Sequence, residues 1–346
     1  MSHELLIHLA AILALTGLAA YAVFGGADFG GGVWDLFAFG PRRDAQRAAI
    51  AHAMGPVWEA NHVWLIFVVV VLFTCFPYGY APLGIALFIP FHLALIGIML
   101  RGAAFIFRGY RSQATGRPSR WGAVFGVTSL ISPFLLGMAF GVVTEGGVHV
   151  NPGGGVTMRP ASLFLEPYTL ACGFLALSTC AYLAAVYLTV ETTGELRDDF
   201  RGHAILSGTT TAMLAALVLF LAHDRADWFF RQITAPRAWP ILAVGGLMFA
   251  ASAWAVFGRR HRLSRFFAAG QVVLMLAGWG VAQRPYLIYP DVTIYDAAAP
   301  RATIAFLLAS FPFGAVFLIP SLWLLFRVFK TTERATNASE VSARPH

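Results

Sequence analysis

The stretch Gly55–Phe76 reads GPVWEANHVWLIFVVVVLFTCF and joins a polar head to a long apolar run. The head brings the carboxylate of Glu59, the amide of Asn61 and the imidazole of His62 close together in the sequence. A helix needs about 20 mostly apolar residues to cross a bilayer, and this stretch is long enough. An acid at mid-bilayer costs about 2.5 to 3.5 kcal/mol even on permissive insertion scales. We therefore expect the polar head to face a protein interior or water.

The composition of the whole chain predicts a membrane protein. Hydrophobic residues make up 58% of the chain and charged residues only 12%, whereas soluble domains carry about 25% charged residues. We predict an all-α, polytopic fold of about nine transmembrane helices, arranged as two four-helix bundles and one peripheral helix. Hydropathy predicts these spans over residues 5–27, 55–76, 81–107, 121–144, 162–190, 204–223, 239–257, 265–283 and 303–329.

Residues 1–330 are predicted to form a single integral-membrane domain. The remaining residues, 331–346, are polar and rich in alanine and serine, and we expect a disordered cytoplasmic tail. The first apolar run lacks a basic n-region and a cleavage pattern of small residues, so we expect it to stay in the protein as a helix. The cysteines lie inside apolar runs without a C-x-x-C motif and are expected to be small core residues: Cys75, Cys172 and Cys180.

The distribution of cationic residues predicts the orientation in the membrane. If the N-terminus is outside, the cytoplasmic segments hold 17 Arg or Lys residues and the external segments hold 6. By the positive-inside rule, the N-terminus is outside and the C-terminus is cytoplasmic. The net charge of +7 then follows from topology, and since no basic soluble domain is present we expect no nucleic-acid partner.

Two acids are predicted to meet at a cytoplasmic entrance. Asp28 stands among the glycines of Phe24–Gly32 at the inner end of the first span, and Glu59 begins the second span from the same side. His52, Glu59 and His62 are spaced by seven and three residues, which places them near one face of a helix. Alternating carboxyl and imidazole groups suit a proton relay. A neutral, hydrogen-bonded acid that stabilises helix packing is the alternative.

Metal and haem ligation by this chain are weaker interpretations. Glu59-x-x-His62 has the form used in di-iron bundles, but such a site needs a second pair and two more glutamates. The nearest second pair, Glu145 and His149, is spaced by four in a glycine-rich loop. His92 lies within the third span and could ligate a haem, yet a single intramembrane histidine more often serves packing. We predict no metal site and no cofactor ligated by this chain.

Several segments bring a known family into view. Gly26–Gly30 at the end of the first span and Gly55–Leu65 on the second resemble the N-terminal signatures of subunit II of cytochrome bd-type quinol oxidases. Thr193–Leu196 after the fifth span is similar to a segment that the family carries at this point of the topology. So is Arg284–Pro290, followed by Asp296-Ala297, before the last span. The resemblance covers the whole chain, and the second-span motif is its most specific part.

The resemblance implies a subunit of a quinol:oxygen oxidoreductase in the bacterial cytoplasmic (inner) membrane, inactive alone. In that family a haem-bearing subunit I carries haem b and haem d and oxidises quinol, and a small single-helix subunit can be attached. Subunit II helps to form the proton path from the cytoplasm. Carried over by motif position, the acids of that path fall on Glu59 and Asp28, with Trp58, Asn61 and His62 as supporting neighbours.

The chain also departs from the family pattern. Many relatives carry Asp-Gly-Phe-Asp where this chain reads Gly25-Gly26-Ala27-Asp28, so one acid of a common pair is absent. Many also have Asp-Gly-Asn where this chain has Glu59-Ala60-Asn61, so the carboxyl is retained on a longer arm. Proton delivery is therefore expected to depend more heavily on Glu59. The alternatives are a transporter or channel subunit, and a purely structural partner of a haem-bearing subunit.

Overall fold

The computed structural model describes residues 2–115, 121–151, 154–160 and 162–342, without the side chains of residues 55–60, 109–115, 319, 322, 323 and 325–342. The long helices in these ranges are α1 (His3–Leu36), α2 (Arg43–Cys75), α4 (Phe88–Thr115), α5 (Trp121–Glu145), α6 (Pro167–Glu191), α7 (Gly194–Arg225), α9 (Trp239–Phe257), α10 (His261–Gln283) and α11 (Arg301–Ser342). The short elements are α3 (Pro77–Ala86), β1 (Val148–Val150), β2 (Val156–Met158), the 3-10 turn η1 (Leu163–Leu165), α8 (Asp227–Ile233), β3 (Tyr286–Ile288) and β4 (Val292–Thr293).

The helices confirm the prediction of an all-α, polytopic membrane protein. Among the described residues, 8 helices are long and apolar enough to cross a membrane. The α2 helix adds a shorter apolar segment, Asn61–Cys75. Many large apolar side chains on these helices are exposed at the surface of the chain, as lipid or a partner subunit requires.

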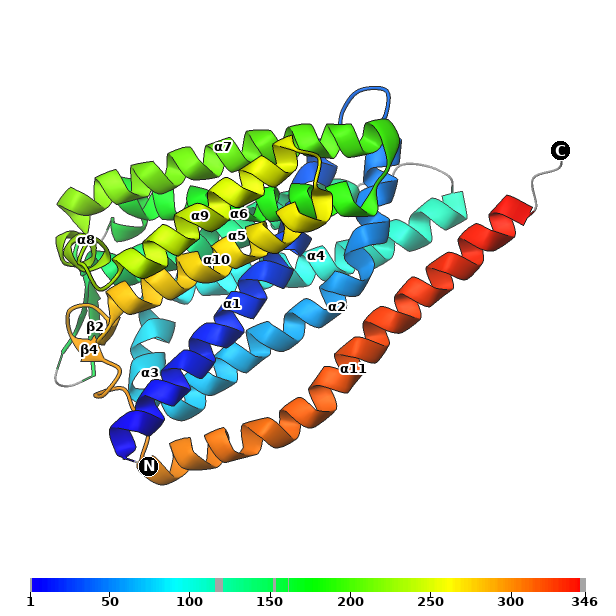
Figure 1. The fold of residues 1–346 in the computed structure, drawn as a ribbon. Helices are drawn as coiled ribbons and strands as arrows, with labels where there is room; N and C mark the ends of the chain where they lie inside the picture. The colour runs from blue at the N-terminus through cyan, green and yellow to red at the C-terminus, as the bar shows by residue number, and fades with distance from the viewer. Residues whose placement is uncertain (1, 116–120, 152–153, 161, 343–346) are drawn as a thin grey trace.

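The helices form two groups that share a central layer (Figure 1). In the first group α1 packs against α2 and α5, and α5 packs against α4. In the second group α6 packs against α7 and α10, and α10 packs against α9. The groups meet where α1 and α5 contact α6, and α11 lies outside both along α1 and α2 (Figure 1). This arrangement agrees with the predicted pair of four-helix bundles and a peripheral helix.

Glycines of α1 allow its close approach to two neighbours. A Cβ atom built on Gly30 would overlap the carbonyl oxygen of Cys180 on α6. One built on Gly32 would overlap the hydroxyl of Ser129 on α5. Because membrane helices associate through close van der Waals packing, small residues at these positions bring the backbones together. The glycine-rich half of α1 therefore packs closely on both α5 and α6.

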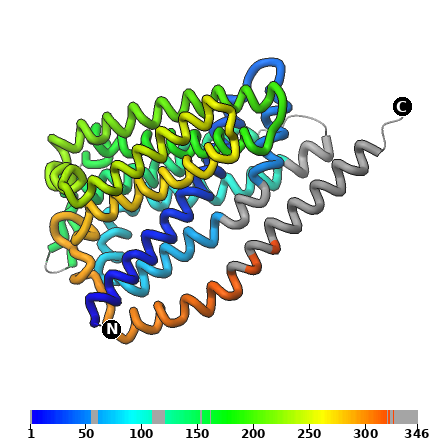
Figure 2. The backbone as a smooth tube through the Cα atoms, in the orientation of Figure 1, coloured from blue at the N-terminus to red at the C-terminus, as the bar shows by residue number. Residues whose placement is uncertain are grey.

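Two short antiparallel hairpins and α8 gather at one end of the bundle (Figures 1 and 2). One hairpin pairs β1 with β2 and the other pairs β3 with β4. Tyr286 and Tyr289, from the segment that resembles the family before the last span, both contact the ring of Trp228 on α8. The described N-terminus lies at this same end (Figure 1), which is the end predicted to be external.

Two helix boundaries differ from the predicted spans in ways that matter for the site. The first helix runs nine residues beyond the predicted span to Leu36, so Asp28 lies inside α1 and not at its end. Hydropathy ended the span early because Gly25–Gly32 is mostly glycine, which is only weakly apolar, and contains the charged Asp28. At the C-terminus, α11 continues to Ser342, and residues 343–346 of the predicted tail lie outside the described residues.

Candidate functional site

The site centres on a buried ion pair between α1 and α4. The carboxylate of Asp28 accepts a hydrogen bond from each terminal nitrogen of Arg101, at 2.5 Å and 2.6 Å. One of these nitrogens also donates to the backbone carbonyl of Asp28 at 2.8 Å. Both side chains are almost fully buried, with 1% and 3% of their surfaces exposed. Asp28 is therefore clamped by a two-pronged, charge-assisted contact.

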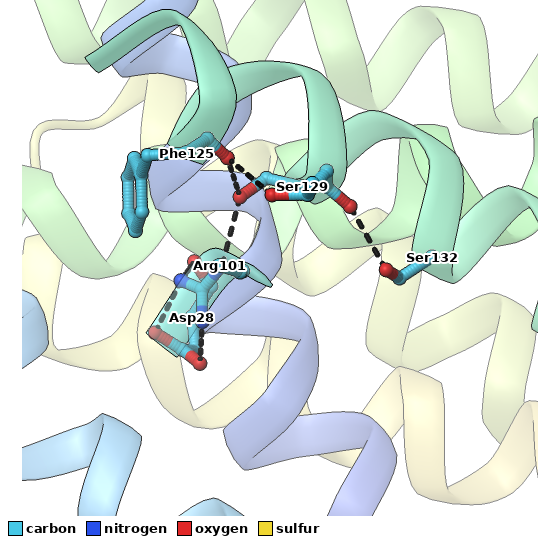
Figure 3. A network of polar contacts seen from close by, with 6 residues as sticks. Asp28, Arg101, Phe125, Ser129 and Ser132 are labelled. Atoms are coloured by element: carbon cyan, nitrogen blue, oxygen red, sulfur yellow. Dashed lines mark hydrogen bonds and ion pairs between the residues drawn. The ribbon is translucent and has the colours of Figure 1, made fainter. Parts of the chain in front are cut away.

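The remaining surface of the guanidinium is also satisfied. The Nε–H group of Arg101 donates to the hydroxyl of Ser129 on α5 at 2.8 Å, and Ser129 donates to the carbonyl of Phe125 at 2.7 Å (Figure 3). The rings of Phe125 and Phe29 lie 4.7 Å and 5.2 Å from the guanidinium carbon. Since buried charges are stable only when paired and hydrogen-bonded, this cage accounts for a cation in the middle of an apolar bundle.

A second ion pair repeats the first one two helical turns away. Arg108 donates to the carboxylate of Asp35 at 2.8 Å, and both pairs join residues 73 positions apart. Equal spacing on α1 and α4 means that the pairs lie about 10.5 Å apart along the helices. Asp35 is buried with 2% of its side chain exposed, whereas Arg108 is 24% exposed. The two ion pairs thus follow one another along α1 and α4, forming a ladder whose second pair, nearer the end of α1, is more exposed to solvent.

Beyond this ladder lies an exposed ionic cluster at the start of α2. Arg42 donates to both carboxylate oxygens of Asp199 and to Glu195 on α7, and Gln46 donates to Asp199 as well. Glu195 belongs to the Thr193–Leu196 segment, so that family-like segment ties α7 to the loop after α1. The hydrogen bond to Asp199 raises the pKa of the Arg42 guanidinium further above its usual range. The cluster fixes the end of the bundle that is predicted to face the cytoplasm.

The predicted residues of α2 fall into three groups. The backbone of Trp58 and Glu59 lies within α2, but their side chains are outside the described part of the chain. Asn61 is 3% exposed and packs on α1, where a Cβ on Gly25 would lie 2.7 Å from its amide oxygen. No described residue bonds that oxygen. Asn61 therefore belongs to the α1–α2 contact beside Asp28.

His62 occupies different surroundings from its neighbour Asn61. It lines a cavity of about 430 Å³ between α2 and α4, whose other walls are apolar. The residues of this cavity are His62, Leu65, Ile66, Leu95, Ile98, Met99, Gly102, Ala103 and Ile106. Two adjacent polar residues of α2 thus point to two separate sides of the helix, as a helical turn of about 100° per residue requires.

The residues weighed as metal or haem ligands have other partners. Glu145 accepts a hydrogen bond from the hydroxyl of Thr169, and His149 contacts Asp291. The two residues therefore have different partners and do not act as a ligand pair. The ring of His92 lies 2.7 Å from the carbonyl of Phe88 in its own helix. In the described part of the chain, no three His, Cys, Asp or Glu residues gather in a way that could hold a metal ion.

Sequence reasoning missed the partner of Asp28, although a signal was present. Arg101 lies well inside a predicted span, 81–107, whereas the other arginines within predicted spans, Arg265 and Arg327, lie within two residues of a span end. Such a residue usually pairs with an intramembrane acid. Asp35 was missed for another reason, because the predicted first span ended before it.

Comparisons with known proteins agree on one family. Residues 6–329 match the family described as cytochrome bd terminal oxidase subunit II. The chain is 24% identical over 331 residues to the "Putative cytochrome bd menaquinol oxidase subunit II" of Bacillus subtilis, covering 92% of this chain and 94% of that protein. It is 30% identical over 248 residues to the "Cytochrome bd ubiquinol oxidase subunit 2" of the same organism, covering 68% of each.

The fold is also that of a solved oxidase. A chain in the structure of bd oxidase from Geobacillus thermodenitrificans superposes with a TM-score of 0.78, at 24% sequence identity, and the match covers 94% of this chain and 98% of that one. The family match runs from residue 6 in α1 to residue 329 in α11 and includes both halves of the Asp28–Arg101 pair. The chain therefore belongs to the cytochrome bd terminal oxidase subunit II family.

Proposed function

We propose that this chain is the subunit II of a bd-type terminal oxidase, which couples quinol oxidation to the reduction of oxygen to water. Its partner is a subunit I that holds haem b and haem d, and the pair resides in the inner membrane with the N-terminus of this chain outside. Reduction of oxygen consumes protons, which must cross a low-dielectric region to reach the haems. This chain helps to conduct them from the cytoplasm.

The observation that carries this proposal is the family match over residues 6–329, which includes Asp28 and the α2 segment that contains Glu59. Both oxygens of Asp28 accept hydrogen bonds from Arg101, so passing a proton through Asp28 would require breaking a buried ion pair. We therefore assign Asp28 a positioning role: it holds α1, α4 and α5 together. Proton transfer is left to Glu59, which shares a helix face with His62 by its spacing of three.

The neighbouring polar groups support this division of roles. Asn61 presents a buried amide oxygen at the α1–α2 contact, and His62 lines the cavity between α2 and α4. Because residue 59 shares a helix face with His62 by its spacing of three, its carboxyl can exchange protons with that imidazole or with water. A transporter subunit would also carry polar groups at mid-membrane, but family membership favours the oxidase.

The proposal is tested with Glu59→Gln, which keeps the shape of the side chain but cannot ionise. We expect quinol-driven oxygen consumption to slow by at least tenfold, since a positioned proton-transfer group contributes about 10² to 10⁴ in rate. The haem spectrum of the purified complex measures assembly and should be unchanged. Full turnover in an assembled Glu59→Gln complex would reject Glu59 as the proton carrier. Absence of haem from the wild-type complex would reject the oxidase itself.

A further inference from the structure

The turn between α9 and α10 carries an unusual concentration of positive charge. Four consecutive residues, Arg259, Arg260, His261 and Arg262, are followed by Arg265 one turn into α10. The start of α7 lies beside this turn (Figure 1), because Arg201 donates to the carbonyls of Val256 and Phe257 at the end of α9. Arginines from two parts of the sequence therefore meet on one surface.

Only part of this charge is balanced within the chain. Arg259 contacts Asp198 at 3.2 Å and Arg265 contacts Glu191 at 3.6 Å. Arg260 and Arg262 have no carboxylate partner among the described residues. The nearby acids Glu195 and Asp199 are already bonded to Arg42. Two guanidinium groups thus remain for an anion from outside the chain.

The backbone of the turn keeps an arginine where glycine is usual. Arg259 has φ of 57°, in the left-handed region. The amide of Arg260 donates to the carbonyl of Ala255 at 2.8 Å, which makes this the C-terminal cap of α9. Such caps favour glycine because a Cβ atom is disfavoured there. The residue next to Gly258 is nonetheless arginine, so the turn holds its charge against its local backbone preference.

The residues around the turn indicate at which level of the membrane the turn lies. The guanidinium carbon of Arg260 lies 4.5 Å from the centre of the Trp254 ring. Trp254, Phe257, Leu263 and Phe266 are all exposed at this end of α9 and α10. Arginine over tryptophan, next to exposed apolar side chains at a helix end, is typical of the level of lipid headgroups.

We propose that the α9–α10 turn binds the headgroup phosphate of an anionic phospholipid, through Arg260 and Arg262. The planar guanidinium donates two parallel hydrogen bonds to a phosphodiester, and the exposed apolar residues of α9 and α10 lie where the acyl chains would run. An anionic lipid offsets part of the positive charge of the two arginines, whereas a zwitterionic lipid brings no net charge. The partner is therefore an anionic phospholipid, and phosphatidylglycerol is the probe for it.

Binding of fluorescent phosphatidylglycerol to the delipidated complex in neutral detergent tests this site. Each cationic residue near an anionic surface contributes roughly a factor of five in affinity, so Arg260→Gln with Arg262→Gln should weaken binding about thirtyfold. Arg260→Lys with Arg262→Lys should lose only a few fold. The control pair, Arg231→Gln with Arg237→Gln, removes two cations near α8, where Asp227 and Gln232 already engage them. This control should bind like the wild type.

Four outcomes would overturn the proposal. The first is unchanged binding in the Gln pair, and the second is an equal loss in the control pair, which would report net charge alone. The third is equal affinity for phosphatidylcholine. The fourth is displacement of the lipid by inorganic phosphate at matched concentration, which would make the ligand a free anion. If the Gln pair does not assemble, the salt dependence of lipid binding to the wild-type complex tests the site instead. Binding that does not weaken as the salt concentration rises would reject the site.

Discussion

Arg101→Met is the most informative substitution at the α1–α4 ion pair. Methionine fills much of the same space but leaves the carboxylate of Asp28 buried and unpaired, because Arg101 supplies both hydrogen bonds to it. The side chain of Asp28 is only 1% exposed, so water cannot replace the lost donor. Breaking a buried pair in this way costs about 3 to 5 kcal/mol. We expect the variant complex to assemble poorly and to lose its haem spectrum at a lower temperature.

Removing both charges distinguishes the ion pair from the packing around it. Asp28→Leu combined with Arg101→Met should recover most of the stability, because paired removal of a buried ion pair is often neutral. Arg108→Met is the matched control on the same helix. Arg108 makes one bond to Asp35 and is 24% exposed, so a loss of about 1.5 to 3 kcal/mol is expected. Thermal melting of the haem absorbance measures all three variants. Wild-type stability in Arg101→Met, or no recovery in the double variant, would refute the reasoning.

Two further predictions concern the contacts of α1 with α6. Gly30→Val should impair assembly of the complex, at a cost of at least 1 to 3 kcal/mol, because any Cβ atom there overlaps the carbonyl of Cys180. Gly84→Ala is its control, with nothing within 4 Å of the added methyl group, and equal damage in both would contradict the close-approach argument. Trp34→Phe should cost about 1 to 3 kcal/mol, since it removes a buried 2.7 Å hydrogen bond to the carbonyl of Ala181. The exposed Trp239→Phe is the comparison, and the melting temperature of the complex reports both.

The fold followed from the sequence because hydropathy reports directly on membrane burial. Apolar runs longer than about 18 residues have few alternatives to a transmembrane helix. Hydropathy was less useful at the helix ends. Because glycine contributes little hydropathy, the glycine-rich stretch Gly25–Gly32 made the predicted span end before the last turns of α1. The close helix contacts at Gly30 and Gly32 consequently lie where the hydropathy signal is weak.

The site was only half predictable. Asp28 is a candidate because an acid in an apolar run is costly, and the same cost applies to Arg101, its buried partner. Register decides the pairing: Asp28 and Asp35 on α1 match Arg101 and Arg108 on α4 only if the two helices lie at one height. A single sequence does not give the axial position of one helix relative to another. The cavity at His62 could not be predicted for the same reason, because it depends on how α2 and α4 lie relative to each other.

Gly25 packs closely against Asn61 in this chain, and this contact can be tested. Many relatives carry an acid at position 25 together with an asparagine at position 61, whereas here a Cβ on Gly25 would lie 2.7 Å and 2.9 Å from the amide atoms of Asn61. Asn61 thus occupies the space that a side chain at 25 would need. Gly25→Asp alone should disrupt the α1–α2 contact, while Gly25→Asp with Asn61→Ala should assemble.

The double variant also probes proton delivery, because it places a new carboxyl near α2 by removing the amide that excluded it. In a Glu59→Gln background we expect the double variant to regain part of the quinol-driven oxygen consumption, and Asn61→Ala alone to regain none. A rescue by Asn61→Ala alone would mean that water, and not the acid at 25, restores the path. Failure of the double variant to assemble would show that Asn61 is not what excludes an acid from position 25, and the spatial argument would fall.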